Sequence, residues 1–585
     1  MSLPLFQQFF GIILFFLPGT LLSYIIAQRT DIIKRTVYAV LLSPLIAVLL
    51  GILLHFLGLF NPICIVSSLI FLNLFFLLTI FILKIKTRTY FNHNLWYLLF
   101  FSLTGTLWRI LFLKSISNFS DTYGYSYKFI ENSIPNLGFY TGMAIDHSRF
   151  IVGDIFFRVC KFLYLDNFIN FVGIFLMTFL FLGFIHLIFS EYRNKKLAFI
   201  GVALMSLGPI EIFYSTAGFF GHSFSYLALF SLFLLYRSED KSYFPITLLL
   251  SITMVFTYFT SAMINFLVSI GFIVSIFIKG LYREKHIKYT VLKCLKNQKL
   301  LFFMLIAIIS SLFIFGSYSL KEYKSGNLQL VTKHIISYPL MRYHDPTFLG
   351  LSAIRWQMLF FFLCGLSLIF YLINKRFDKK SLLENADLIL CSIPVLIVSF
   401  MFFYSNLPTR IFNYFAFFGL LAIKIPRKYL RSFFILSFIF IFLTSWFVAK
   451  DKRVFFETSD KEIEGALWIN NSLKGKIFSD QPFVNQLVLN GYYNVTGAYD
   501  DDPLIYNLFY QNDSYMFLNA VNTLTTDLNA RYIVITKRMQ QKYILMVNVP
   551  QKPLININVY ERYLEKIYDN GDSRVYKTNK AYTDI

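Results

Sequence analysis

Apolar segments recur along the chain from Leu5 to Val448 and are separated by short polar connections. Most of these segments run for roughly 17–25 residues, which is long enough for a helix to cross a hydrocarbon layer about 30 Å thick. The pattern predicts about fourteen transmembrane helices. The first apolar segment follows neither a basic head nor a small-residue cleavage site, so we expect it to be retained as a span.

The pattern changes after residue 450. KEIEGALWINNSL has helical spacing, KIFSD is typical of a short strand ending at Asp480, and RYIVITKR is typical of a buried strand. About 135 residues are enough for one soluble α/β domain with its own core. We therefore expect an N-terminal membrane module of about four helices (1–113), a large loop with an interfacial helix (114–166), the remaining helix bundle (167–450) with a second large loop (318–351), and the α/β domain (451–585).

Composition agrees with this division. Hydrophobic residues make up 57% of the 585 residues and charged residues only 15%, which is too little polar surface to cover a soluble globule of this size. The expected fold class is an α-helical, polytopic membrane protein with a soluble α/β domain at its C-terminal end.

The distribution of Lys and Arg predicts orientation. The formal net charge is +22, and 26 of the 54 basic residues fall on alternate connections, whereas the short turns near Asn61, Gly218 and Tyr258 contain none. By the positive-inside rule the basic connections are cytoplasmic. Both termini, both large loops and the α/β domain are then extracytoplasmic. The positive charge is thus interpreted as a topology signal, and we expect no nucleic-acid partner.

Absent motifs narrow the chemistry. The chain contains no P-loop, no Rossmann glycine fingerprint, no HExxH and no paired CxxC, which disfavours ATP-driven transport by this chain, dinucleotide redox chemistry and a thiolate zinc site. None of the five cysteines lies after residue 450. A soluble domain without disulfides outside the membrane favours a prokaryotic cell envelope.

The stretch NFSDTYGYSYKFIENSIPNLG, Asn118 to Gly138, interrupts the apolar pattern. DTYGYSYKFIEN is typical of an amphipathic helix lying along the interface. Asp121 is a helix N-cap in one interpretation, with Tyr125 and its neighbours forming an aromatic belt. In the other interpretation, Asp121 is a carboxylate at a low-dielectric boundary that acts as a general base. The two interpretations are compatible.

Further ionisable residues cluster at the predicted outer edge of the membrane. The segments are IDHSRF, GPIEIFYSTAGFFGH, MRYHDP and NLPTRIFNY, and their candidate residues are His147, Arg149, Glu211, His222, His344, Asp345 and Arg410. Ionisable residues at membrane depth usually face a polar cavity, although a single His there is often a hydrogen-bonded packing residue. A guanidinium such as that of Arg410 pairs well with a phosphate, and its alternative role is snorkelling to lipid headgroups.

The order of these parts resembles the GT-C superfamily of membrane glycosyltransferases. SDTYGYSYKFIENSIPNLG is similar to the family's Asp followed by aromatic residues and a helix ending at Gly, and STAGFFGHSFSY is similar to a stretch of oligosaccharyltransferases. The acidic pair of that stretch is absent, and His222 stands near its place. The WWDYG sequence of oligosaccharyltransferases is also missing. These departures argue against transfer of a whole oligosaccharide to asparagine.

The resemblance implies a mechanism. A polyprenyl-phosphate sugar would place its phosphate at Arg410, and Asp121 would take the proton from an acceptor hydroxyl as the sugar moves with inversion. The acceptor would be a glycan, a lipid or a protein. The other candidates would contact the sugar or phosphate, and the loop with His344 and Asp345 would close over the site. A divalent metal could use Asp121, Glu211 and His222, but we expect none to be required.

Three other classes stay open. A polysaccharide polymerase or ligase would share the outer site and differ in its acceptor. A transporter of lipid-linked saccharides would place charged or broken helices near the bilayer midplane. A non-catalytic assembly protein of the cell envelope would keep its function when Asp121 is replaced.

Overall fold

A computed structural model describes two compact units, a helical unit within residues 3–450 and a unit with a β-sheet within residues 459–578. The described residues are 3–59, 61–112, 166–192, 195–208, 220–257, 259–284, 297–325, 347–348, 351–401, 416–424, 427–450, 459–480, 483–484, 486–487, 492, 494–497, 507–509, 513–541 and 555–578.

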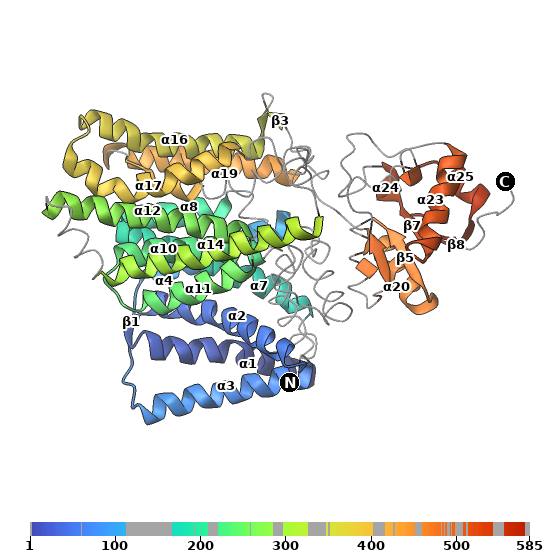
Figure 1. Ribbon diagram of the computed structural model, residues 1–585, viewed down its shortest axis with the longest axis horizontal. Helices are drawn as coiled ribbons and strands as arrows, with labels where there is room; N and C mark the ends of the chain where they lie inside the picture. The colour runs from blue at the N-terminus through green and yellow to red at the C-terminus, as the bar shows by residue number, and fades with distance from the viewer. Residues whose placement is uncertain are drawn as a thin grey trace. The chain divides into compact units, whose positions relative to one another are not determined.

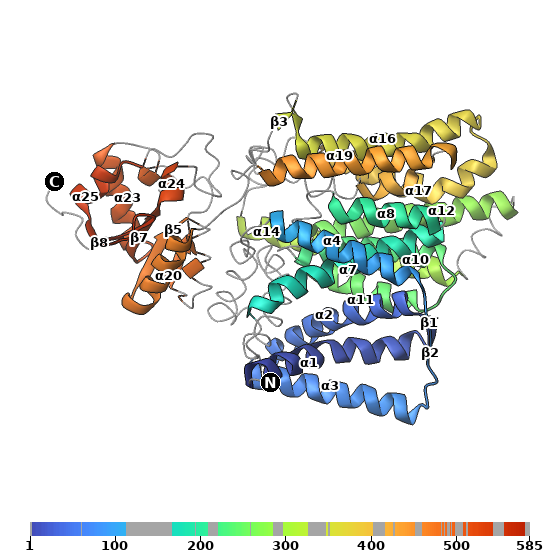
Figure 2. The same ribbon diagram turned by 180° about the vertical axis from the view of Figure 1, so that it is seen from behind.

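The helical unit consists of long helices that run side by side along a common direction (Figures 1 and 2). Their bounds are α1 (Leu3–Ile26), α2 (Ile32–Phe56), α3 (Pro62–Ile82), α4 (Asn94–Phe112), α7 (Asp166–Tyr192), α8 (Lys195–Leu207), α10 (Phe220–Arg237), α11 (Tyr243–Thr257), α12 (Phe259–Glu284), α14 (Gln298–Ser325), α16 (Ala353–Asn374), α17 (Lys379–Met401) and α19 (Leu430–Lys450). A 3₁₀ turn spans Arg427–Tyr429. Two short ladders accompany the helices, β1 (Arg29–Asp31) parallel to β2 (Arg88–Tyr90) and β3 (Thr347–Phe348) antiparallel to β4 (Leu351–Ser352).

Several of these helices suit a membrane. Four are long and apolar enough to cross one, at Ile32–Gly51, Ile63–Ile82, Phe175–Tyr192 and Ala262–Tyr282, and shorter apolar helices accompany them. In α3, Phe71 and Phe81 are 71% and 80% exposed, as expected of side chains that face lipid rather than water. The chain is a membrane protein, and the number of about fourteen spans stays a prediction.

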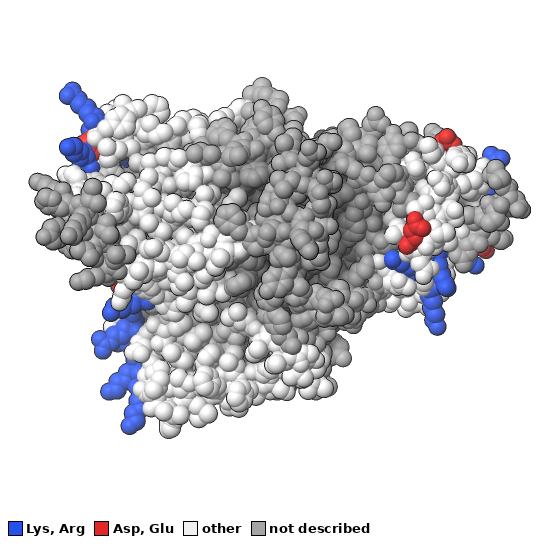
Figure 3. All heavy atoms as spheres, viewed as in Figure 1, with Lys and Arg blue, Asp and Glu red and all other residues white. Residues whose placement is uncertain are grey.

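Basic connections gather at one end of the helical unit, which we call the basic end (Figure 3). Arg29 in β1 pairs with Arg88 in β2, which brings the connections after α1 and α3 together. Lys34 forms a salt bridge with Asp240. Lys299, at the start of α14, donates from Nζ to the carbonyl of Ser238 at 2.7 Å. The alternation of basic connections found in the sequence therefore corresponds to one end of the bundle.

A buried carboxylate joins four helices at the basic end. The side chain of Asp387, in α17, is fully buried. It accepts hydrogen bonds from Arg237 Nε and Nη2 at 3.0 and 2.9 Å, and from the Tyr192 hydroxyl at 2.9 Å. Lys279 Nζ lies 3.8 Å from the same carboxylate. Two cationic side chains and a hydroxyl offset the desolvation of Asp387, so the contact fixes α7, α10 and α12 against α17.

We expect Asp387→Asn to destabilise the helical unit by roughly 1–3 kcal/mol, because Arg237 and Lys279 lose the charge of the buried carboxylate between them. Arg237 and Lys279 are 29% and 31% exposed, so each can turn toward solvent, which limits the effect. The thermal unfolding midpoint of the full chain in a mild detergent measures this. Asp378→Asn is the matched control, since Asp378 is exposed at the start of the same helix. Equal midpoints for the two variants would contradict the prediction.

The second unit contains a five-stranded mixed sheet in the order β6-β5-β7-β9-β8. Its strands are β5 (Lys476–Ser479), β6 (Val495–Gly497), β7 (Ala530–Thr536), β8 (Glu565–Asp569) and β9 (Ser573–Lys577), and its helices are α20 (Asp460–Ser472), α23 (Ser514–Thr526), α24 (Lys537–Gln541) and α25 (Ile557–Tyr563). β5, β6 and β7 are parallel, whereas β9 is antiparallel to both β7 and β8. The helix and the two strands predicted from KEIEGALWINNSL, KIFSD and RYIVITKR are found as α20, β5 and β7.

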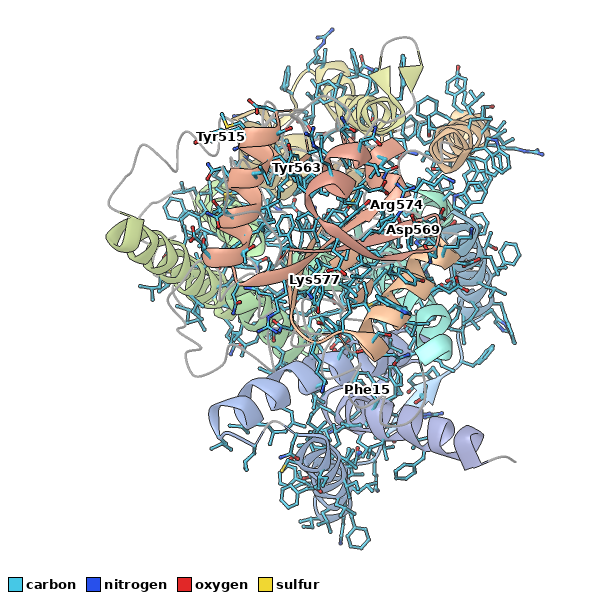
Figure 4. The ribbon with its side chains drawn as sticks, turned by 90° about the vertical axis from the view of Figure 1, so that its right-hand side faces the viewer. Phe15, Tyr515, Tyr563, Asp569, Arg574 and Lys577 are labelled. Carbon is cyan, nitrogen blue, oxygen red and sulfur yellow. The ribbon has the colours of Figure 1, made fainter. Side chains whose placement is uncertain are left out.

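Local signals explain where these elements begin. Ser459 caps α20 by accepting from the amide of Glu462, and Asp513 caps α23 in the same way. β7 is an almost continuous apolar run because one core cluster lies on each face of the sheet, around Ile533 and Val534 respectively. The β8–β9 hairpin carries an exposed ion pair, in which Arg574 Nε donates to Asp569 at 3.0 Å; Figure 4 labels both residues.

Candidate functional site

A buried polar cluster surrounds the carboxyl end of α8, away from the basic end. Arg109, near the end of α4, is fully buried and donates from Nη1 to the carbonyl oxygens of Gly105 at 3.0 Å and Ser206 at 2.8 Å. The Ser445 hydroxyl of α19 donates to the carbonyl of Leu207 at 3.0 Å. Two of the last carbonyl groups of α8, which have no partner within their own helix, are thus satisfied by side chains of other helices.

A third helix completes this arrangement. Gln357 of α16, 1% exposed, donates from Nε2 to the Thr444 hydroxyl at 2.8 Å and to the Ser445 hydroxyl at 3.1 Å. The Ser445 hydroxyl therefore accepts from α16 while it donates to α8. We call Arg109, Gln357, Thr444 and Ser445 the α8 clamp.

Two glycines allow the helices to approach this closely. A Cβ atom at Gly105 would lie 2.8 Å from both the Arg109 guanidinium and the Ser206 carbonyl oxygen. A Cβ atom at Gly208, directly after α8, would lie 2.8 Å from the Ile441 side chain. Because real Cβ atoms do not come so near, α4 and α19 can contact the end of α8 only with glycine at these positions.

Most of the residues predicted from the sequence lie outside the described residues. These are Asp121, Tyr125, His147, Arg149, Glu211, His344, Asp345 and Arg410. His222 lies in the first turn of α10, where the backbone is described but the side chain is not. That these nine residues contact one another therefore stays a prediction.

The helices that flank the candidate segments nevertheless share one end of the unit. Tyr192 and Arg237 bring the ends of α7 and α10 to the basic end, so both helices begin at the opposite end. α8 runs away from the basic end, and the α8 clamp places the end of α4, the start of α16 and the end of α19 beside its carboxyl end. The candidate segments between α4 and α7, between α8 and α10 and before α16 therefore connect to helix termini at this opposite end.

The second unit contains a buried charged triad that the sequence pattern did not reveal. Arg538 donates to both oxygens of Asp480, from Nη1 at 2.6 Å and Nη2 at 2.9 Å, and its Nε lies 3.6 Å from Glu462. The three side chains are 7%, 0% and 2% exposed. Asp480 directly follows β5, and Arg538 is the second residue after β7. Both therefore lie at the carboxyl ends of neighbouring parallel strands, at the point where the chain leaves β5 for β6 on one side while β7 lies on the other.

The triad has one more carboxylate than cation, which changes its proton affinities. Burial raises the pKa of Glu462, the nearby Arg538 lowers it, and the charge of Asp480 raises it further, with a net upward direction. Burial by itself lowers the pKa of Arg538, but Asp480 and Glu462 outweigh it and raise the pKa above its usual value. Arg538 thus stays charged, and the affinity of the Glu462 carboxylate for a proton is raised.

Glu462 is expected to make the stability of the second unit pH-dependent. Since its folded pKa is raised above the unfolded value of 4.5, the folded state binds the extra proton, and stability falls as pH rises through the window above 4.5. Glu462→Gln removes this titration. The unfolding midpoint of the parent chain should therefore fall relative to that of Glu462→Gln between pH 4.5 and pH 7. A midpoint difference that is constant across this range would contradict the direction of the pKa shift.

Metal ligands are not grouped in the described part of the chain. Among these residues, no three His, Cys, Asp or Glu side chains come together in a way that could hold a metal ion. The predicted set of Asp121, Glu211 and His222 involves side chains outside that part, so it stays a prediction.

No protein-family model matches the chain, and no curated protein matches it in sequence. Solved structures of the Archaeoglobus fulgidus oligosaccharyltransferase align with this chain. The apo crystal structure aligns at a TM-score of 0.45 and 14% identity, over 77% of this chain and 70% of that chain.

Two other structures of that oligosaccharyltransferase give similar values. The form tethered to an acceptor peptide containing the NVT sequon aligns at a TM-score of 0.46 and 12% identity, over 83% of this chain and 74% of that chain. The form in complex with an inhibitory peptide and a dolichol-phosphate aligns at 0.46 and 11%, over 76% and 70%.

Sequence reasoning missed the α8 clamp. Serine, threonine, glutamine and glycine are ordinary residues of membrane helices, so only Arg109 carried a usable signal. It ends an apolar segment on the side where the positive-inside rule does not call for an arginine. The argument that singled out Arg410 applies to Arg109 as well.

Proposed function

We propose that this protein is an integral membrane glycosyltransferase that moves a sugar from a polyprenyl-phosphate donor to an acceptor at the end of the helical unit opposite the basic end. Asp121 is the general base in this proposal, and Arg410 neutralises the phosphate of the leaving lipid. The basic end is cytoplasmic, so transfer occurs on the extracytoplasmic side.

One observation carries the proposal. The candidate segments between α4 and α7, between α8 and α10 and before α16 lie far apart in the sequence but connect to helix termini at one end of the bundle. A base, a phosphate-binding cation and sugar-contacting groups can act together only if the helices bring their segments to a common place. The sequence resemblance to the GT-C superfamily supplies the assignment of roles.

The roles follow from side-chain chemistry. The Asp121 carboxylate accepts the proton of the acceptor hydroxyl while that oxygen bonds to the anomeric carbon, and the sugar–phosphate bond breaks with its electron pair going to the lipid phosphate. Glu211, His147 and His222 offer hydrogen bonds to sugar hydroxyls, and Arg149 offers a second cation near the phosphate. The reaction needs no metal in this proposal, although Asp121, Glu211 and His222 carry the oxygen and nitrogen ligands that a divalent ion prefers.

The purified full chain in liposomes provides the test. A polyprenyl-phosphate donor with a labelled sugar is supplied together with membrane glycoconjugates from the cells that make the protein. Movement of label from the lipid phosphate to a single acceptor product supports the proposal. A ladder of growing products favours a polymerase. Movement of intact donor across the bilayer without transfer favours a transporter and would overturn the proposal.

A further inference from the structure

A basic surface joins the end of α1 to the end of α3. The parallel ladder of β1 with β2 places Arg29 directly beside Arg88. The Arg88 amide donates to the carbonyl of Gln28 at 2.8 Å, and Arg35 Nη2 donates to the carbonyl of Ala27 at 2.8 Å. Two connections that lie far apart in the sequence are thus held together by the fold itself.

The charge of this surface is not balanced. We call its four exposed cations the ladder patch, and they are Arg29, Lys84, Lys86 and Arg88. Among the described residues, no carboxylate forms an ion pair with any of the four, whereas nearby Lys34 pairs with Asp240. The only acidic residue within 27–35 and 84–93 is Asp31, whose carboxylate accepts from the backbone amide of Lys34 at 2.9 Å. Like charges that face each other in a sheet are destabilising, so the pair of arginines favours an anion above it.

The ladder patch lies where an apolar helix ends. The candidate span Ile63–Ile82 stops two residues before Lys84. Ile82 and Leu83 are 70% and 64% exposed, which indicates that lipid reaches the last turn of α3. The headgroup layer extends roughly 5–7 Å beyond the hydrocarbon core, so cations this close to the end of a span lie at the depth of lipid phosphates.

The side chains around the ladder suit a lipid headgroup. Residues in register on neighbouring strands share a face, so the guanidinium groups of Arg29 and Arg88 lie on the same side of the ladder, and such groups donate to phosphate oxygens in pairs. Arg88 also lies over the ring of Tyr90, 5.2 Å from its centroid. Tyr90 and Phe91 are 47% and 59% exposed, and aromatic rings are favoured at this depth.

We propose that the ladder patch binds the phosphate of an anionic phospholipid in the leaflet at the basic end, with the acyl chains of that lipid along α3. An anionic phospholipid matches both parts of the surface, because it carries a phosphate for the cations and apolar chains for the exposed side chains of α3. The bound headgroup offsets the repulsion between Arg29 and Arg88. The binding is independent of the proposed sugar transfer and is tested without it.

Phosphatidylglycerol, added to the purified full chain in an uncharged detergent, is the probe, and native mass spectrometry measures how much is retained. The test variant is Arg29→Gln/Lys84→Gln/Arg88→Gln. Each basic residue near an anionic lipid surface adds roughly fivefold to affinity, so we expect this variant to bind phosphatidylglycerol roughly a hundredfold more weakly than the parent.

Lys375→Gln/Arg376→Gln/Lys379→Gln is the matched control. It removes three exposed cations where α16 meets α17, a connection that also carries the acidic residue Asp378. We expect its affinity for phosphatidylglycerol to stay within about threefold of the parent. Equal weakening in the two variants would show only a general attraction of the basic end to anionic lipid, and would overturn the proposed site.

Two measurements on the parent do not depend on the folding of a variant. Retention of phosphatidylglycerol should fall between about 0.01 M and about 1 M salt, over which the Debye length shortens from about 30 Å to about 3 Å. Retention that ignores salt, or equal retention of phosphatidylcholine, would overturn the anionic headgroup as the ligand. Displacement of the lipid by an equal concentration of glycerol 3-phosphate would overturn a lipid in favour of a soluble phosphate.

Discussion

Replacing Asp121 with Asn is expected to lower sugar transfer by roughly 10²- to 10⁴-fold, which is the usual contribution of a positioned general base. Asparagine keeps the size of the side chain and its capacity to cap a helix, so the loss isolates proton acceptance from any structural role of Asp121. Transfer by the parent should rise with pH as the carboxylate loses its proton, and this dependence should disappear in the variant.

Glu131→Gln is the matched control for Asp121→Asn. Glu131 lies in the same polar stretch, ten residues further along, and the substitution removes the same charge. Transfer from the labelled donor and retained binding of the donor lipid are measured for both variants. Undiminished transfer by Asp121→Asn, or an equal loss in both variants, would remove Asp121 from the mechanism.

Replacing Arg538 with Met is expected to destabilise the second unit by roughly 3–5 kcal/mol, as does breaking a buried ion pair from one side. The substitution leaves Asp480 and Glu462, 0% and 2% exposed, without their counter-ion. Proton uptake by Glu462, whose pKa is already raised, offsets only part of the cost. Proteolysis of residues 459–578 in the full chain, followed against temperature, measures the loss.

Arg574→Met is the matched control for Arg538→Met. Arg574 pairs with Asp569 on the surface of the same sheet, where both side chains are 27% exposed (Figure 4). A surface pair of this kind contributes about 0–1 kcal/mol, so the proteolysis midpoint should hardly move. Midpoints that move equally in the two variants would show that the buried triad contributes no more than a surface ion pair.

The membrane character of the chain could be predicted because it depends on local composition, whereas the division near residue 450 stays a prediction. An apolar run long enough to cross a bilayer forms a helix whatever its neighbours, since its backbone groups have no other partners in lipid. The basic connections could be assigned to one end for a similar reason, because successive spans alternate in direction. Strands such as β7 were recognisable from a short buried apolar run.

The candidate site could be predicted only as residue types in polar segments. Asp121, Glu211 and Arg410 were selected because ionisable groups at the membrane boundary are costly and therefore informative. Neither their spacing nor their type shows which of them meet. The basic connections predict the directions of the helices, and the contact of Tyr192 with Asp387 shows that the end of α7 lies at the basic end. That the candidate segments meet at the opposite end stays a prediction.

The sequence by itself determined the apolar helices, the end at which the basic residues gather and the local caps and strands of the second unit, because each depends on residues within a few positions. Only the tertiary structure decided the partners of the buried polar groups. Ser445 meets Leu207 across 238 positions, Arg237 meets Asp387 across 150, and Arg538 meets Asp480 across 58. Contacts at such separations depend on how whole helices and strands pack, and that packing leaves no periodic trace in the chain.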